Sequence, residues 1–276
     1  MYTYCSNNPI IYTDPTGHWT REVHITDTKK WATQELNKYI TKDIVVYKTD
    51  KKGNTKTDKK GNPLVDDKKT AEAKKECIKD NKKLVTKYVN DLTTGDEYVD
   101  QETNMLHNNH TDNILFHGFE QKGKASNNLF VNDRKSTAVS ILNSDSFSKN
   151  STKDNIKTYI TNPINTLAGN TEKTSKSLST AKAPTTYFSS KEEAAMFTLG
   201  MGLHTVQDTE AHFKDKHNVD YSDNTKIDDW KYNAKTEKYV FTLGSDRIKA
   251  TEKLTRNYIK DFVNTNGDKL SFEIPK

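Results

Sequence analysis

The segment LGMGLHTVQDTEAHF, residues 199–213, places His204, Asp208 and His212 at intervals of four residues. In an α-helix the positions i, i+4 and i+8 lie on one face, so these three side chains share one side of the helix. Residues 194–203 are apolar almost without interruption, which predicts that the helix is buried nearly all round. The face that carries His and Asp therefore belongs to a core helix.

The spacing along this helix favours more than one metal ion. Positions i and i+8 are about 12 Å apart at 1.5 Å per residue, whereas zinc bonds to His or Asp are about 2.0–2.2 Å long. One ion can therefore bind His204 with Asp208, and a second ion can bind His212. Small residues at 200, 202 and 211 leave room for segments that carry further ligands. The alternative is that both histidines are ordinary core or surface residues, which Asp208 only orients.

The composition predicts a modest core with wide polar loops. Of 276 residues, 32% are hydrophobic and 29% are charged, and the net charge of +5 arises from 43 basic and 38 acidic residues. This balance indicates a mixed surface and not the basic footprint of a dedicated nucleic-acid binder. No apolar run approaches the roughly 18 residues that span a bilayer. Cys5 and Cys77 alone do not form a disulfide framework, and residues 1–17 lack the features of a signal peptide.

Helical periodicity recurs along the rest of the chain. It predicts amphipathic helices at 22–42, 67–92 and 245–265, and a weaker one around 156–167. Thr26 or Asp27 could cap the first helix, and the serines and glutamates of SSKEE at 189–193 predict a capping box for the central helix. Residues 93–150 and 214–235 are expected to be largely irregular.

Strand signals are few and short. DIVVYKT, from residue 43, and KYVFTLG at 238–244 are candidate strands. TDKKGN occurs at 49–54 and again at 57–62, which predicts a hairpin arm or a flexible loop. The expected fold class is therefore mainly α, a multi-helix bundle with polar loops and a minor β-hairpin.

The first residues, MYTYCSNNPIIYTDPTG, closely resemble the end of the Rhs-repeat core domain of polymorphic toxins. In that family this segment closes a cage around a variable C-terminal toxin. The resemblance implies that residues 1–18 end the Rhs core, that residues 19–276 are the toxin domain, and that the chain is the C-terminal part of a larger protein. Cleavage in such proteins follows the Asp-Pro-x-Gly element, which places it here near His18 or Trp19.

The central helix carries a second resemblance. LG-x-G-LHT-x-QD-x-x-AH is similar to the central helix of the zinc-dependent phospholipase C superfamily, which supplies His and Asp ligands to a cluster of zinc ions. The resemblance implies a fold of that type with two or three zinc ions, and it places His204, Asp208 and His212 on ligand positions. It also implies that His24, within VHIT, is a ligand.

The same resemblance implies a further His segment between these two. DNILFHGF makes His117 the best candidate, His107 and His110 are alternatives, and Asp100 or Asp112 could be the acidic ligand or the general base. No His-x3-Glu pair follows His212, unlike in the superfamily, so His217, Asp246 or Glu252 could replace it, or one zinc ion is absent. Cleavage at Trp19 could add an N-terminal ligand.

These features predict a secreted or delivered zinc-dependent phosphodiester hydrolase toxin, a phospholipase C acting on the membranes of competitor cells. Zinc would polarise phosphoryl oxygens and lower the pKa of a water, with Asp112 as general base. The expected partners are a phospholipid membrane, a cognate immunity protein and the upstream Rhs cage, with no specific nucleic acid. The alternatives are a zinc-dependent nuclease of related architecture and a membrane-active payload without enzymatic activity.

Overall fold

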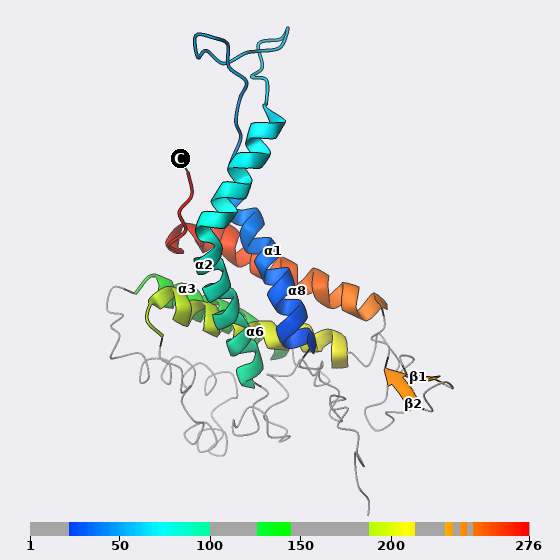
Figure 1. Cartoon of the computed structure of the whole chain (residues 1–276). Coiled ribbons are helices and arrows are strands. Elements are labelled where there is room, and N and C mark those ends of the chain that lie inside the picture. Colours follow the sequence, from blue (N-terminus) through cyan, green and yellow to red (C-terminus); the bar gives the residue numbers. More distant parts are fainter. Residues whose placement is uncertain are drawn as a thin grey trace, which may run out of the picture.

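The computed structural model describes residues 22–99, 126–144, 188–212, 230–233, 238–241 and 245–275. These residues are mostly helical, so the predicted mainly α class is confirmed (Figure 1). The helices are α1 (Thr28–Thr41), α2 (Asp67–Val99), α3 (Ser126–Leu142), α6 (Lys191–His212) and α8 (Ser245–Asn266). A π-helix, η1 (Glu22–Asp27), precedes α1, and a 3₁₀ turn, η4 (Gly267–Lys269), follows α8.

Helix α6 lies at the centre of the bundle. It packs against α2, α3 and α8, while α1 packs against α2 and α8. Residues 194–203 of α6 are all buried, as the sequence predicted. Apart from the two glycines, they carry apolar side chains or, in the case of Thr198, a threonine side chain. The predicted capping residues do cap the helix: Ser190 Oγ accepts the backbone N–H of Glu193 at 3.3 Å, and the Glu193 carboxylate accepts the backbone N–H of Ser189, one residue before the N-cap, at 3.1 Å.

Glycines bring α2 and α6 into backbone contact. A Cβ atom on Gly95 of α2 would lie 1.9 Å from the carbonyl oxygen of Phe197, and one on Gly200 of α6 would lie 1.9 Å from that of Leu92. Either position therefore excludes any side chain while the two helices keep this distance. The room that the sequence predicted at Gly200 is thus occupied by α2.

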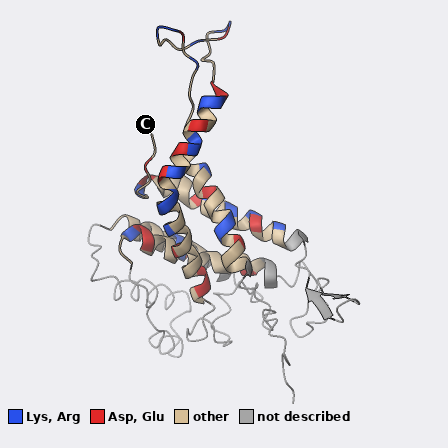
Figure 2. Cartoon of the chain, in the orientation of Figure 1, with Lys and Arg blue, Asp and Glu red and all other residues tan. Residues whose placement is uncertain are grey.

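The chain between α1 and α2 forms an arm, residues 44–66, at the end of the projecting half of α2 (Figure 1). Each TDKKGN copy makes the same turn, in which the aspartate carboxylate accepts backbone N–H groups, for example those of Lys52 at 2.8 Å and Asn54 at 2.9 Å on Asp50. The duplication therefore encodes a hairpin arm. Basic and acidic residues are interspersed along α2 and the arm (Figure 2).

Some local predictions were wrong. Residues 126–142 form α3 where irregular chain was expected, because a helix rich in Asn, Ser and Thr shows little periodicity and gains its stability by packing against α6. Helix α2 continues to Val99, and Asp27 makes no side-chain cap. Strand β2 (Lys238–Phe241) forms as predicted, but it pairs antiparallel with β1 (Trp230–Asn233), which was expected to be loop.

None of the helices in the described ranges is both long and apolar enough to cross a membrane.

Candidate metal centre

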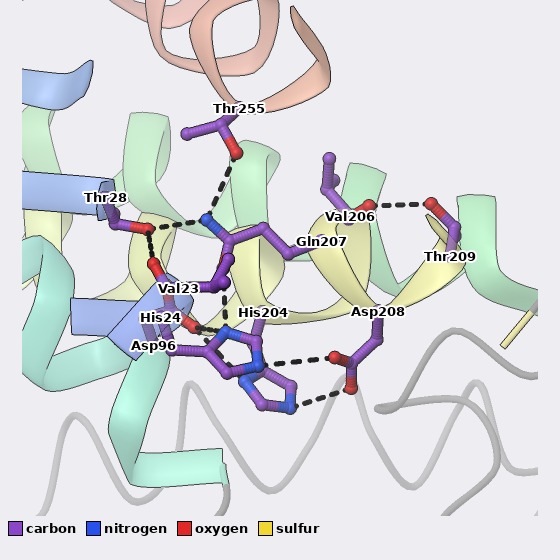
Figure 3. A network of polar contacts seen from close by, with 10 residues as sticks. All are labelled: Val23, His24, Thr28, Asp96, His204, Val206, Gln207, Asp208, Thr209 and Thr255. Atoms are coloured by element: carbon purple, nitrogen blue, oxygen red, sulfur yellow. Dashed lines mark hydrogen bonds and ion pairs between the residues drawn. The ribbon is translucent and has the colours of Figure 1, made fainter. Parts of the chain in front are cut away.

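Three elements that are far apart in sequence bring two histidines and two aspartates together in the core. His24 comes from η1, Asp96 from the end of α2, and His204 with Asp208 from successive turns of α6 (Figure 3). The exposed fraction is 1% for His24 and 0% for the other three residues. Buried ionisable side chains at such density require mutual compensation or a bound ion.

The four side chains form a closed ring of polar contacts. The imidazoles of His24 and His204 stack with their centroids 4.4 Å apart and their planes 20° from parallel. Asp96 Oδ1 lies 2.9 Å from Nδ1 of His24 and 3.1 Å from Nδ1 of His204. On the other side, the Asp208 carboxylate lies 3.3 Å from Nε2 of His24 and 3.0 Å from Nε2 of His204. Each aspartate thus faces one edge of the histidine pair.

This geometry fits a metal ion. Bonds of about 2.0–2.1 Å in a tetrahedral zinc site separate neighbouring ligand atoms by about 3.3 Å, close to the His–Asp distances in the ring. Ligand atoms of His24, Asp96 and His204 all lie within 4.8 Å of one another. Within the described part of the chain, Asp96 Oδ2 is buried without a hydrogen-bond partner, and His24 Nε2 has only the Asp208 carboxylate at 3.3 Å. Such an atom costs about 1–3 kcal/mol, which coordination to a cation would remove.

The two carboxylates also control the charge of His24. Burial favours the neutral imidazole, but Asp96 and Asp208 oppose this effect and raise the pKa of His24 well above its ordinary value of 6.5. In the absence of a metal ion, a proton on the imidazole thus partly compensates the acidic pair. A cation in the ring would provide the same compensation.

The local structure around His24 explains how the histidine reaches the core. The π-helical turn of η1 is wider than an α-helical one, and such turns occur frequently at functional sites. The hydroxyl of Thr28, the first residue of α1, donates a hydrogen bond to the carbonyl of Val23 at 2.9 Å and so closes this turn. On α2, Gly95 permits the backbone contact with α6 that places Asp96 beside His204.

The structure brings together three of the predicted ligands, His24, His204 and Asp208. His212 ends α6, and its side chain lies outside the described residues, as does that of Asp246 in α8. Glu252 accepts a hydrogen bond from Arg256 at 2.7 Å. The remaining candidates lie outside the described residues: His18, Trp19, Asp100, His107, His110, Asp112, His117 and His217.

Asp96 is the member of the ring that the sequence analysis missed. The sequence analysis predicted Asp100 or Asp112 as the acidic residue and ended the helix at residue 92, so Asp96 fell in a segment expected to be irregular. A signal was nevertheless present in Gly95. A glycine inside a helix costs about 1 kcal/mol relative to alanine. Its presence therefore indicates that another backbone approaches closely, and Asp96, the next residue, lies beside that contact.

Comparison with known proteins adds no assignment: the chain matches no family model, no curated protein and no solved structure.

Proposed function

We propose that this chain is a zinc-dependent phosphodiester hydrolase, a phospholipase C that serves as the payload of a polymorphic toxin. The observation that supports the metal is the buried ring of His24, Asp96, His204 and Asp208, which three separate elements assemble. Neutral imidazoles with carboxylates are ligands that zinc accepts readily. The choice of reaction rests on the resemblance of residues 199–212 to the zinc-dependent phospholipase C superfamily.

The residues of the ring would have distinct tasks. His24 and His204 would hold a zinc ion together with Asp208 or Asp96. When bound, zinc supplies Lewis-acid polarisation of a phosphoryl oxygen and lowers the pKa of a nearby water towards 7. The carboxylates compensate the positive charge, and the stacked rings keep the two histidines at a fixed separation. We keep Asp112 as the general base in this proposal. Its role is supported by the sequence alone, because it lies outside the described residues.

The biological setting in this proposal follows from the first 17 residues. Their resemblance to the end of an Rhs core implies delivery as the C-terminal part of a larger protein, with a cognate immunity protein and the Rhs cage as partners. The substrate would be the phosphodiester between diacylglycerol and the headgroup of membrane phospholipids. A nuclease of related architecture is the alternative outcome of the test.

The test combines metal analysis with two substrates. Purified protein would be analysed for bound zinc by elemental mass spectrometry, and then assayed on mixed phospholipid vesicles and on single-stranded nucleic acid, before and after treatment with a chelator. We expect bound zinc, release of phosphorylated headgroup, loss of this activity with the chelator and its recovery when zinc is restored.

The variants His204→Ala and Asp208→Ala should each bind less zinc and lose activity. Asp80→Ala is the matched control, because it removes an exposed carboxylate from α2 and should keep both zinc and activity. Chelator-sensitive cleavage of nucleic acid alone would replace the phospholipase with the nuclease. Zinc-free wild-type protein, or full zinc occupancy in both ring variants, would overturn the proposal.

A further inference from the structure

Gln207 links the candidate metal centre to three helical elements. This side chain is fully buried on α6, between His204 and Asp208 in the sequence (Figure 3). Its amide nitrogen lies 2.6 Å from Thr28 Oγ1 of α1 and 3.1 Å from Thr255 Oγ1 of α8. Its amide oxygen lies 2.7 Å from Nδ1 of His24. One amide thus contacts both a predicted ligand and two buried hydroxyl groups.

The orientation of this amide follows from the hydrogen-bond chemistry of Thr28. The carbonyl oxygen of Val23 can only accept, so the Thr28 hydroxyl must donate its single proton there, over 2.9 Å. The same hydroxyl must then accept a hydrogen bond from Gln207 at 2.6 Å. The NH₂ group of Gln207 therefore faces Thr28, and its oxygen faces His24.

The orientation of Gln207 determines which nitrogen of His24 carries the proton. An amide oxygen only accepts, so the contact of 2.7 Å requires a hydrogen on Nδ1 of His24. Asp96 Oδ1, 2.9 Å from the same nitrogen, is a second acceptor for this hydrogen. In the neutral ring Nε2 then has the free electron pair, and it faces Asp208 at 3.3 Å.

We propose that Gln207 is a positioning residue that holds the proton of His24 on Nδ1, so that Nε2 is the nitrogen with which His24 binds the metal ion of the proposed function. The ion then lies on the Asp208 edge of the histidine pair, and Asp96, whose ligand atom lies within 4.8 Å of those of both histidines, supports the ligands from behind and does not bind the ion itself. Asp96 on the opposite edge accepts the Nδ1–H group, as carboxylates behind metal-binding histidines commonly do. Thr28 and Thr255 act through Gln207, which makes α1 and α8 part of the support of the site.

The direct test is the tautomer of His24 in the metal-free protein. Two-bond ¹H–¹⁵N correlation spectra at alkaline pH, where the ring is neutral, distinguish Nδ1–H from Nε2–H, and a His24→Gln variant identifies the signal. We expect the Nδ1–H form. A predominant Nε2–H form would overturn the inference. Because this measurement needs no metal, it decides the inference even if wild-type protein fails to bind zinc and the proposed function falls.

Variants of Gln207 test its role separately from the fold. Gln207→Leu removes one of the two acceptors at Nδ1. Asp96, 2.9 Å from Nδ1, must then compete alone with Asp208, 3.3 Å from Nε2, so part of neutral His24 should shift to the Nε2–H form, and zinc affinity should fall by about 10–100-fold. Gln207→Glu keeps an acceptor and should retain the tautomer. The matched control is Thr198→Val, which removes another buried hydrogen bond of α6, to the carbonyl of Ala194 at 2.8 Å, and should leave His24 unchanged.

The outcomes of the variants are also decisive. Gln207→Leu protein that keeps the Nδ1–H tautomer and wild-type zinc affinity would overturn the role of Gln207. If this variant does not fold, Thr28→Val replaces it, because it removes the hydroxyl group that fixes the orientation of the Gln207 amide. We then expect a mixture of tautomers. A tautomer that stays unchanged in Thr28→Val would contradict the inference.

Discussion

At the scale of single residues, the two aspartates of the ring face different nitrogen atoms of the histidine pair. Asp208 faces the Nε2 atoms of both histidines, and Asp96 faces their Nδ1 atoms. If zinc lies on the Nε2 edge, Asp208 binds it directly, whereas Asp96 needs only to accept hydrogen bonds. An asparagine can accept such a hydrogen bond but is a poor zinc ligand.

Asp208→Asn should therefore weaken zinc binding more than Asp96→Asn. We expect the loss of affinity with Asp96→Asn to remain within about 10–100-fold, the usual range for a partner behind a ligand. Asp208→Asn should abolish stoichiometric binding. Competition titration with a fluorescent zinc chelator measures both affinities. The reverse order would place the ion on the Asp96 edge.

A second residue, Asp91 of α2, lies in an unusual environment outside the ring. Burial and the nearby Glu193 carboxylate raise the pKa of Asp91 to about 7, although Lys87 acts in the opposite direction. Among the described residues, its buried Oδ2 atom has no hydrogen-bond partner. Glu193 itself is held by Lys87 and by Ser189, so its charge remains close to Asp91.

Asp91→Asn should stabilise the protein above pH 7. The folded state keeps the proton of Asp91 up to a pKa of about 7, whereas the unfolded chain releases it near 3.8, so the wild type loses stability as pH rises between these values. Asparagine removes this loss, by about 1 kcal/mol for a partly exposed group. Urea unfolding at pH 5 and pH 8 measures it, with exposed Asp80→Asn as control. An equal gain at both pH values would contradict the assignment.

At the scale of elements, the crossing of α2 and α6 determines where Asp96 lies. Gly95 and Gly200 allow backbone contact at this crossing, and Asp96 follows Gly95 directly. The position of the carboxylate therefore depends on the distance between two helix axes more than on its own side-chain conformation. A change that separates the helices should displace Asp96 without altering any residue of the ring.

Gly95→Ala should destabilise the fold and reduce zinc binding together. Its Cβ would lie 1.9 Å from the Phe197 carbonyl oxygen, so the helices must separate, at a cost of about 1–3 kcal/mol or more. Gly61→Ala is the matched control, because its Cβ would meet no atom within 4 Å although its φ is +86°. It should cost about 1–2 kcal/mol in the arm and leave zinc unchanged. Urea unfolding and elemental analysis compare the two, and equal zinc occupancy would contradict the expected coupling.

The sequence predicted the elements whose apolar residues repeat with helical spacing. It did not predict the elements that are stabilised by tertiary contacts and lack such a repeat. Helix α6 was predicted from its unbroken apolar run and its capping residues, whereas helices α1 and α8 and most of α2 follow from the helical spacing. Helix α3 does not, because it buries Arg134 and Thr137, and buried polar side chains obscure an amphipathic pattern. Strand β1 was missed because a four-residue strand depends on its partner more than on its own sequence.

At the scale of the whole molecule, the candidate site joins parts of the chain that local patterns cannot relate. His204 and Asp208 are one helical turn apart, so their proximity follows from the helix alone. His24 and Asp96 reach them only because η1 and α6 both pack against α2. The resemblance suggested His24, but Asp96 required the helix crossing. Because three elements form the ring, an ion bound in it would stabilise the packing of the whole bundle.

Zinc should therefore stabilise the entire described bundle. A ligand that binds only the folded state adds about 2.7 kcal/mol at a concentration 100-fold above its Kd. For a chain of this size that corresponds to a rise in Tm of about 5–10 °C. Differential scanning calorimetry of chelator-treated protein, with and without added zinc, measures the shift.

Magnesium is the control for this experiment, because it prefers oxygen ligands and should not bind a pair of imidazoles. His204→Ala removes one imidazole and should abolish the zinc shift, whereas Asp80→Ala should retain it, since Asp80 lies on the exposed face of α2. A shift of equal size in all three proteins would mean that zinc binds elsewhere. No shift in the wild type would mean that the ring stabilises the bundle by its own hydrogen bonds, without an ion.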